Sequence, residues 1–123
     1  MSLDLTLYKR TGESPEEEVD IWWRNITHNL SGMADHVPTG AYTLYQLLWR
    51  PDEHGFDRVT NEYIRLVIDA IPYMYDHRKE LERFNPENGW GSYEGLMAFV
   101  NDYALFLTTL DLDDEEILIY ASR

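Results

Sequence analysis

Hydrophobic and polar residues alternate at both ends of the chain. The segment Leu3–Leu7 has leucine at every second position, which is the period of a half-buried strand, and the polar stretch 9–12 after it is typical of a turn. Near the other end, the β-branched and aromatic run 117–120 follows an acidic turn at 111–116. We therefore expect one short strand at each end of the chain.

A helix is predicted from about residue 15 to residue 36. Ser14 suits the N-cap and Pro15 the first helical position, and the acids that follow complement the helix dipole. Apolar residues then recur at helical spacing and form one stripe about 100° wide on a helical wheel: Val19, Trp22, Trp23, Ile26, Leu30 and Met33. The segment 37–40 is predicted to end this helix.

Three more helical segments are predicted further along the chain. The first covers 42–49 and is closed by Arg50 and Pro51, because a residue before proline is disfavoured in the helical region. The second covers about 59–84, where Pro72 is expected to kink or divide it. The third begins after Ser92, a natural N-cap, and its apolar residues repeat at helical spacing as far as Leu110.

These elements predict a single α+β domain over residues 1–123. Three to four helices are expected to pack with a small antiparallel ribbon formed by the N- and C-terminal strands. A two-stranded ribbon is marginal by itself, so it must pack on the helices. Its open edge suits pairing with another chain, which makes a homodimer one expected assembly.

Charge and composition narrow the classes of partner. The 123 residues include 10 Lys and Arg against 23 Asp and Glu, giving a net charge of −13, and 44% are hydrophobic. The aromatic content of 14% argues against disorder, and the acidity disfavours direct binding to nucleic acid or to anionic membranes. No run approaches the roughly 20 apolar residues of a membrane span, so a cytoplasmic protein of the bacterial host is expected. Ten of the acids fall in the segments 13–20 and 111–116, so the rest of the chain is close to neutral. The net charge therefore excludes some classes of partner but does not identify one.

Two polar clusters are candidates for binding chemistry. On the helical wheel Asn25 and Asn29 share a flank with Gly32 and His36, where the two amides would either grip a ligand or anchor neighbouring loops. The second cluster, 49–54, combines an indole, a guanidinium, two carboxylates and an imidazole. It would bind an anion while the indole stacks on a base or sugar, or it would be a buried Trp beside a local ion pair.

The third candidate is the glycine-rich segment 88–94, which opens a helix. Backbone N–H groups at such a point can receive an anion, but neither nucleotide-binding glycine pattern is present. Trp90 and Tyr93 would line a small-molecule site or cap the core. The sequence contains no known catalytic motif, and no cofactor is predicted. A metal site shared by His28 and His36 is not expected either, because the two residues would lie about 12 Å apart along a helix.

Several of these motifs together resemble a known family. N-I-T-H-N at 25–29, L-W-R-P at 48–51 and N-G-W-G-S-Y-E at 88–94 occur in this chain. The sequence resembles a family of small uncharacterised proteins found in phages, prophages and mobile elements. The resemblance implies a phage or mobile-element setting and supplies no mechanism.

In that setting the motifs predict one ligand-binding pocket. Its members are residues of rare type gathered at helix ends, with the last one delivered by the final strand: Asn25, Asn29, Trp49, Arg50, Asn88, Trp90, Tyr93 and Arg123. Trp22 and Trp23 are assigned to the core, whereas Trp49 and Trp90 are assigned to loop edges.

The function expected from these features is a non-enzymatic accessory protein. It would bind a host protein or a small nucleotide-like metabolite and so counter a host defence. One alternative is a small hydrolase that uses His28, His36 or His54 with nearby acids. The other is an acidic mimic of DNA that occupies a basic host protein.

Overall fold

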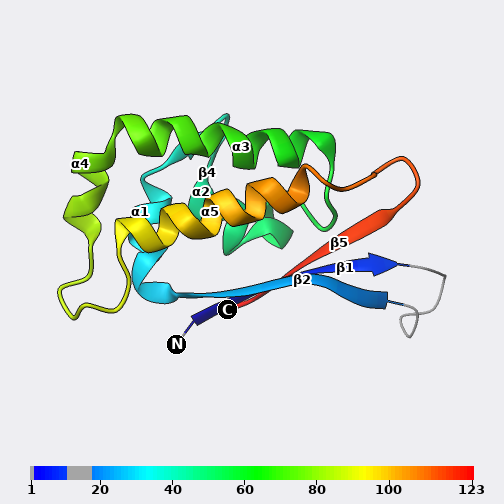
Figure 1. Cartoon of the computed structure of the whole chain (residues 1–123), viewed down its shortest axis with the longest axis horizontal. Coiled ribbons are helices and arrows are strands. Elements are labelled where there is room, and N and C mark those ends of the chain that lie inside the picture. The colour runs from blue at the N-terminus through cyan, green and yellow to red at the C-terminus, as the bar shows by residue number, and fades with distance from the viewer. Residues whose placement is uncertain (1, 11–17) are drawn as a thin grey trace.

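A three-stranded antiparallel sheet with helices on one of its faces forms the fold, seen here in a computed structural model that describes residues 2–10 and 18–123 (Figure 1). The strands β1 (Ser2–Arg10), β2 (Glu18–Thr27) and β5 (Glu116–Ser122) lie in the order β2-β1-β5. The predicted α+β class and the pairing of the first and last strands are confirmed. The sheet also contains β2, which the sequence pattern did not predict.

The helical layer contains two long helices and several short ones. The elements are α1 (Ser31–Asp35), α2 (Leu44–Leu48), α3 (Asn61–Asp76), α4 (Arg78–Leu81) and α5 (Tyr93–Leu107), with 3-10 turns η2 (His28–Leu30), η3 (Pro51–His54) and η4 (Glu82–Phe84) and a small ribbon of β3 (Pro38–Thr39) and β4 (Tyr42–Thr43). In the described part of the chain, no helix combines the length and apolar character needed to cross a bilayer.

The prediction of one helix over 15–36 is wrong. Residues 18–27 form strand β2, helical structure begins only at His28, and the predicted N-cap and first turn at 14–17 lie outside the described residues. Trp22 and Ile26 are both buried, and a spacing of four fits a helix and a strand equally well. The β-branched and aromatic residues between 19 and 27 favour the strand. Val19 and Trp23, which belonged to the predicted apolar stripe, are exposed.

The later helices largely follow the prediction. Ser92 caps α5, because its hydroxyl accepts a hydrogen bond from the backbone N–H of Gly95, and the predicted apolar face of α5 is buried. Helix α3 starts after Thr60, which caps it in the same way. It continues through Pro72 as far as Asp76, so Pro72 does not divide it. The division comes at His77, whose backbone leaves the helical region.

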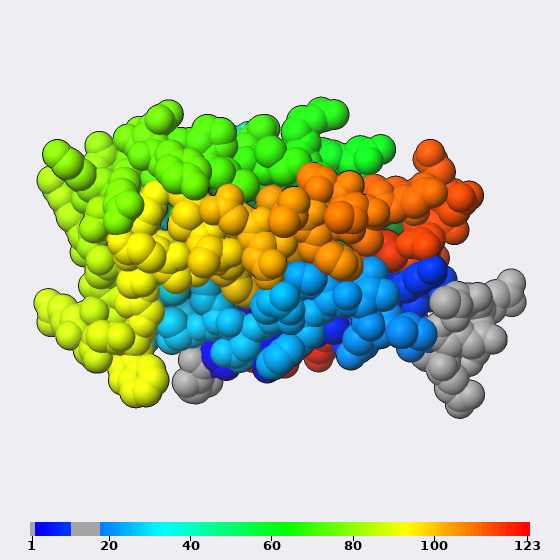
Figure 2. Space-filling view, viewed as in Figure 1, coloured from blue at the N-terminus to red at the C-terminus, as the bar shows by residue number. Residues whose placement is uncertain are grey.

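The core lies between the sheet and the helices. Helix α5 packs against β2 (Figure 2), where Trp22 meets the rings of Phe99 and Tyr103 at centroid distances of 5.9 Å and 4.8 Å. Tyr103 in turn reaches Tyr63 of α3, and their hydroxyl oxygens are 2.8 Å apart. The Tyr63 hydroxyl donates to the carbonyl oxygen of Leu47 in α2. This buried chain of hydrogen bonds ties three helices together.

The opposite face of the sheet carries no helix or strand from the described parts of the chain (Figure 1). Side chains alternate along a strand, so burial of the leucines at positions 3, 5 and 7 places the even-numbered residues of β1 on this outer face. A bulge in β2 changes the pairing between Leu7 and Tyr8, so that Asp20 lies opposite Tyr8. The bulge thereby moves Asp20 to the outer face.

Candidate functional site

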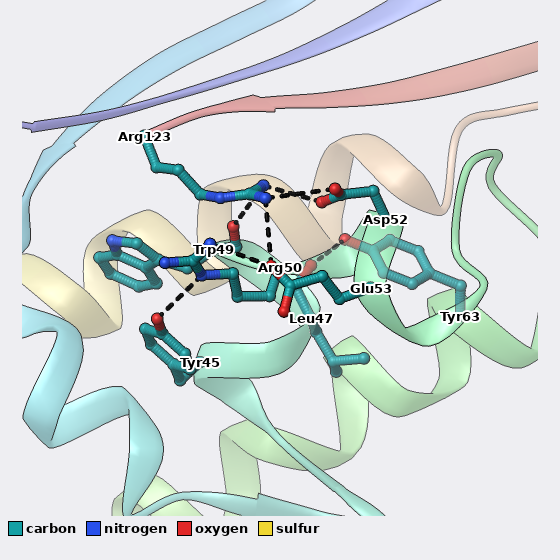
Figure 3. A network of polar contacts seen from close by, with 8 residues as sticks. All are labelled: Tyr45, Leu47, Trp49, Arg50, Asp52, Glu53, Tyr63 and Arg123. Atoms are coloured by element: carbon teal, nitrogen blue, oxygen red, sulfur yellow. Dashed lines mark hydrogen bonds and ion pairs between the residues drawn. The ribbon is translucent and has the colours of Figure 1, made fainter.

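The eight residues predicted to share one pocket lie in three different places. Trp49, Arg50 and Arg123 belong to a network of polar contacts around η3 (Figure 3). Asn88 and Tyr93 take part in the loop and start of α5. Only Asn25, Asn29 and Trp90 line a common pocket.

The network around η3 ties the last strand to the helical layer. Arg123 donates to the carbonyl oxygen of Trp49 at 3.2 Å and forms ion pairs with Asp52 and Glu53. The hydrogen bond from Arg123 lowers the pKa of the Asp52 carboxyl group. Arg50 pairs with Glu53 at 2.9 Å, so both guanidinium groups already contact acids (Figure 3). This arrangement matches the alternative of a local ion pair beside a buried Trp.

Trp49 is 2% exposed and therefore offers no stacking surface. Its indole N–H donates to Nδ1 of His28 at 2.9 Å, and its ring is stacked with that of Tyr45. Tyr93 is equally enclosed, and its hydroxyl donates to the carbonyl oxygen of Met74. Burial raises the pKa of Tyr93 despite the guanidinium of Arg78 over its ring.

The pocket that contains Asn25, Asn29 and Trp90 lies where β1 begins and β2 ends. It has a volume of about 390 Å³ and is also lined by Ser2 and Thr27. The side-chain amide of Asn25 donates to the Ser2 hydroxyl and to the Asp4 carboxylate, at 2.7 Å and 2.8 Å. The pocket therefore adjoins the outer face of the sheet.

An aromatic cluster on the outer face was missed by the sequence analysis. Trp23 of β2 and Tyr120 of β5 lie directly opposite Thr6 of β1, one on each side. They are 53% and 56% exposed, whereas Thr6 between them is only 7% exposed, on a face that none of the helices in the described residues covers. The ring of Tyr8 follows at 6.4 Å from that of Tyr120. We call Tyr8, Trp23 and Tyr120 the aromatic cluster.

Acidic groups surround the aromatic cluster. Asp4 and Asp20 lie on the same face, and at its far end Arg10 lies between Glu18 and Glu116, with which it forms ion pairs at 3.0 Å and 3.8 Å. Arg58 pairs with Leu118, which lies opposite Tyr8, and so belongs to the same face. Four carboxylates and two guanidinium groups therefore give this face a net charge of −2. Partial burial raises the pKa of the Tyr8 hydroxyl, and the nearby Asp20 carboxylate raises it further.

Basic residues elsewhere on the strands point toward the helices. Lys9 pairs with Glu115, and Arg24 pairs with Asp102 of α5. The pairing of Arg24 fits its position opposite the buried Leu5. The uncovered face is thus more acidic than the strands as a whole.

Within residues 2–10 and 18–123, none of the histidines forms an ion pair with an acid, and the His54 ring packs against that of Tyr42. His28 accepts from Trp49, while Nδ1 of His36 and of His77 faces a backbone carbonyl one helical turn earlier. Within the same residues, no group of three or more His, Asp or Glu could hold a metal ion. A cavity of about 500 Å³ between 58–61 and 112–117 is lined by four acids and Arg58.

Trp23 could have been identified as a surface residue from the sequence if residues 18–27 had been assigned to a strand. Adjacent residues of a strand point to opposite faces, so Trp22 and Trp23 cannot both be buried by one layer of helices. The signal was present in the β-branched composition of this segment.

The chain was also compared with known proteins. No protein-family model, no curated protein and no solved structure matches it. The resemblance to small phage and mobile-element proteins therefore stays a prediction from the motifs. A binding partner is therefore inferred from the geometry and charge of this protein's own surface.

Proposed function

We propose that this chain is a non-enzymatic binding protein that engages a basic partner protein through the outer face of its sheet. The observation that carries the proposal is the exposed aromatic cluster on three adjacent strands, in the centre of an acidic and uncovered sheet face. In the phage or mobile-element setting that the motifs suggest, the partner is a host protein.

The aromatic cluster supplies the apolar part of such an interface. Tyr and Trp are enriched at protein interfaces because a rigid ring contributes a large contact area, and single aromatic residues often dominate the binding energy. Trp23 and Tyr120 are about half exposed and project from paired strands, and the ring of Tyr120 lies 6.4 Å from that of Tyr8. Little ordering of these side chains is then required on binding.

The charge of the face selects the partner. Asp4, Asp20 and the two glutamates beside Arg10 favour lysine or arginine side chains, which also interact with the faces of Trp and Tyr rings. Phosphate groups would be repelled by the same carboxylates. The charge therefore supports a basic protein over a nucleotide-like metabolite at this face.

The two alternative functions have less support. A hydrolase that used His28, His36 or His54 would need one of them beside an acid. In the described residues, His28 contacts an indole, His36 a backbone carbonyl and His54 the ring of Tyr42. A DNA mimic would need an array of carboxylates along one face. The described acids are instead distributed over strands, helices and turns, and many are paired with Lys or Arg.

The proposal can be tested with peptides of defined charge. Isotope-labelled protein is titrated with hexa-arginine and, as a control, with hexa-glutamate. We expect the amide signals of 4–8, 19–25 and 118–122 to shift with hexa-arginine only. No shift, or shifts restricted to the acidic turn at 111–116, would refute binding at the sheet face.

Variants separate specific docking from general charge attraction. The double variant Trp23→Ala/Tyr120→Ala should bind hexa-arginine about tenfold more weakly, because both rings are lost. Leu105→Ala removes an apolar side chain from α5 that is also more than half exposed, and it serves as the control, with unchanged binding expected. Equal affinity of the double variant and the control would contradict a role for the aromatic cluster.

A further inference from the structure

The pocket at the end of the sheet is separate from the aromatic cluster in its composition. Its lining comes from the start of β1, the end of β2, the turn after it and the loop before α5: Ser2, Asn25, Thr27, Asn29 and Trp90. The lining has one indole, two amides and two hydroxyls, and no Lys or Arg. Its volume of about 390 Å³ lies within the range of small-molecule sites, about 300–1,000 Å³.

The indole of Trp90 is presented by a backbone that is held on both sides. The Trp90 N–H donates to the side-chain oxygen of Asn88 at 2.9 Å, and the Trp90 carbonyl accepts from the amide of Asn29 at 3.3 Å. The side chain itself is 72% exposed. A fixed backbone with a free ring face is an arrangement that lowers the ordering cost of stacking a ligand on that ring.

Gly91 fixes the loop against the sheet. Its φ of +106° is strained for other residues, and a Cβ there would lie 2.9 Å from a methyl group of Thr27 and 3.0 Å from Leu30. The loop thus approaches the end of β2 more closely than a side chain would permit. This close approach sets the position of Trp90 beside Asn29.

The polar groups of the pocket favour a ligand that donates hydrogen bonds. The Nδ2 groups of Asn25 and Asn29 donate to Ser2, Asp4 and the Trp90 carbonyl. Both residues line the pocket, and an amide oxygen can accept a hydrogen bond from a ligand there. Hydroxyl groups are such donors. The Asp4 carboxylate, bound to Asn25 at 2.8 Å, disfavours a phosphate beside it.

We infer that this pocket binds an uncharged, hydroxylated ring compound. One face of the ring stacks on the Trp90 indole, and its hydroxyl groups donate to the amide oxygens of Asn25 and Asn29. This chemistry is shared by a saccharide unit and by the ribose and base of a nucleoside. The proposed docking of a basic protein relies on the rings of Trp23 and Tyr120, and Asp4 is the residue that the two proposals share.

The experiment is a titration of the full chain with neutral and charged ring compounds, followed through the indole N–H signal of Trp90. The probes are the methyl glycosides of glucose, galactose, mannose and N-acetylglucosamine, the nucleosides adenosine and uridine, and adenosine monophosphate. Binding of a glycoside alone identifies a saccharide site, and binding of a nucleoside alone identifies a nucleoside site. Tighter binding of the monophosphate than of adenosine, or no binding of any neutral probe, overturns the inference.

Variants connect the binding to the indole. Trp90→Ala should weaken binding of the responding probe at least about tenfold, as expected for loss of a stacked ring, and Trp90→Phe should restore part of it; both are followed by calorimetry. Tyr75→Ala removes another exposed ring, on α3, and should leave binding unchanged. Unaltered binding by Trp90→Ala overturns the inference. Trp23→Ala should not affect this site, so failure here and failure of the proposed protein docking are distinguishable.

Discussion

Trp22 and Trp23 are neighbours in the chain and should respond very differently to replacement by alanine. Trp22 is buried and its ring contacts Phe99 and Tyr103 of α5, whereas Trp23 projects from the outer face of the sheet. Replacing a fully packed Trp by Ala removes the transfer free energy of the ring and leaves a cavity. We expect Trp22→Ala to lower the free energy of unfolding by about 3–5 kcal/mol.

The loss in the free energy of unfolding expected for Trp23→Ala can be estimated from the exposure of Trp23. About half of the 150–250 Å² that an aromatic side chain can bury stays in water, since Trp23 is 53% exposed. Alanine retains part of the remainder, so about 50–80 Å² of burial is lost, which at about 25 cal/mol per Å² corresponds to roughly 1–2 kcal/mol. No cavity forms, because solvent fills the vacated space.

The assay is urea unfolding of both variants and the parent chain, followed by far-ultraviolet circular dichroism. A larger loss for Trp22→Ala by at least about 2 kcal/mol is expected, with native-like spectra before the transition. Equal losses would refute the reasoning, because a helix that buried both side chains in one stripe would make the two residues equivalent. A small cost for Trp23→Ala also ensures that weaker binding by that variant reflects the lost ring.

Three further predictions concern the buried and charged groups. Burial raises the pKa of Tyr63 and of Tyr103 above the value of about 10 that a tyrosine has in the unfolded chain. Their contribution to stability is therefore complete below that pH and decreases above it. The free energy of unfolding should fall between about pH 9 and 12, and less steeply in a Tyr63→Phe/Tyr103→Phe chain. Asp52 has a lowered pKa because of Arg123, so the pair stabilises the chain above about pH 4 and less as pH falls through the folded value. Asp52→Asn should therefore cost less than about 1 kcal/mol at pH 6, and its cost should decrease as the pH is lowered, as measured by thermal unfolding. Gly91→Ala should destabilise the chain by about 1–3 kcal/mol, and more than the same change at position 89, where no atom lies within 4 Å of the added methyl group; equal effects would contradict the close approach of this loop to β2.

The parts of the fold that could be predicted from sequence have an unambiguous period. Leucines at every second position of β1 fit only a strand, and the apolar residues of α5 repeat over four turns behind the Ser92 cap. The segment 18–27 lacks such a pattern because the bulge at Ile21 interrupts the alternation, and Trp22 and Ile26 have a spacing that suits both periods. This segment becomes a strand because it pairs with β1 along its whole length, and that pairing cannot be read from the segment's own pattern.

The candidate site could be predicted only in part for a related reason. Asn25, Asn29 and Trp90 do line one pocket, since the segments that carry them are held together at the end of β2 by the hydrogen bond from Asn29 to the Trp90 carbonyl. Arg50 and Trp49 were grouped with them by residue type alone. Whether a charged side chain points to a pocket or to a nearby acid depends on tertiary placement, and Arg50 lies next to Glu53 in space as well as in sequence.

The position of charge on the surface is more informative than the total charge of the chain. A net charge of −13 is compatible with solubility alone, and it does not distinguish a protein partner from a cation or from no partner at all. A net charge of −2 on the face that carries Trp23 and Tyr120 is more restrictive, because the exposed rings offer apolar contact area and the carboxylates repel phosphate groups and acidic side chains. The carboxylate of Asp4 acts on both surfaces, since Asn25 links it to the pocket beside Trp90. If both proposals hold, the Asp4 carboxylate attracts cations at the sheet face and disfavours phosphate in the adjoining pocket. Asp4→Asn should then weaken binding of hexa-arginine at the face and reduce the exclusion of adenosine monophosphate from the pocket.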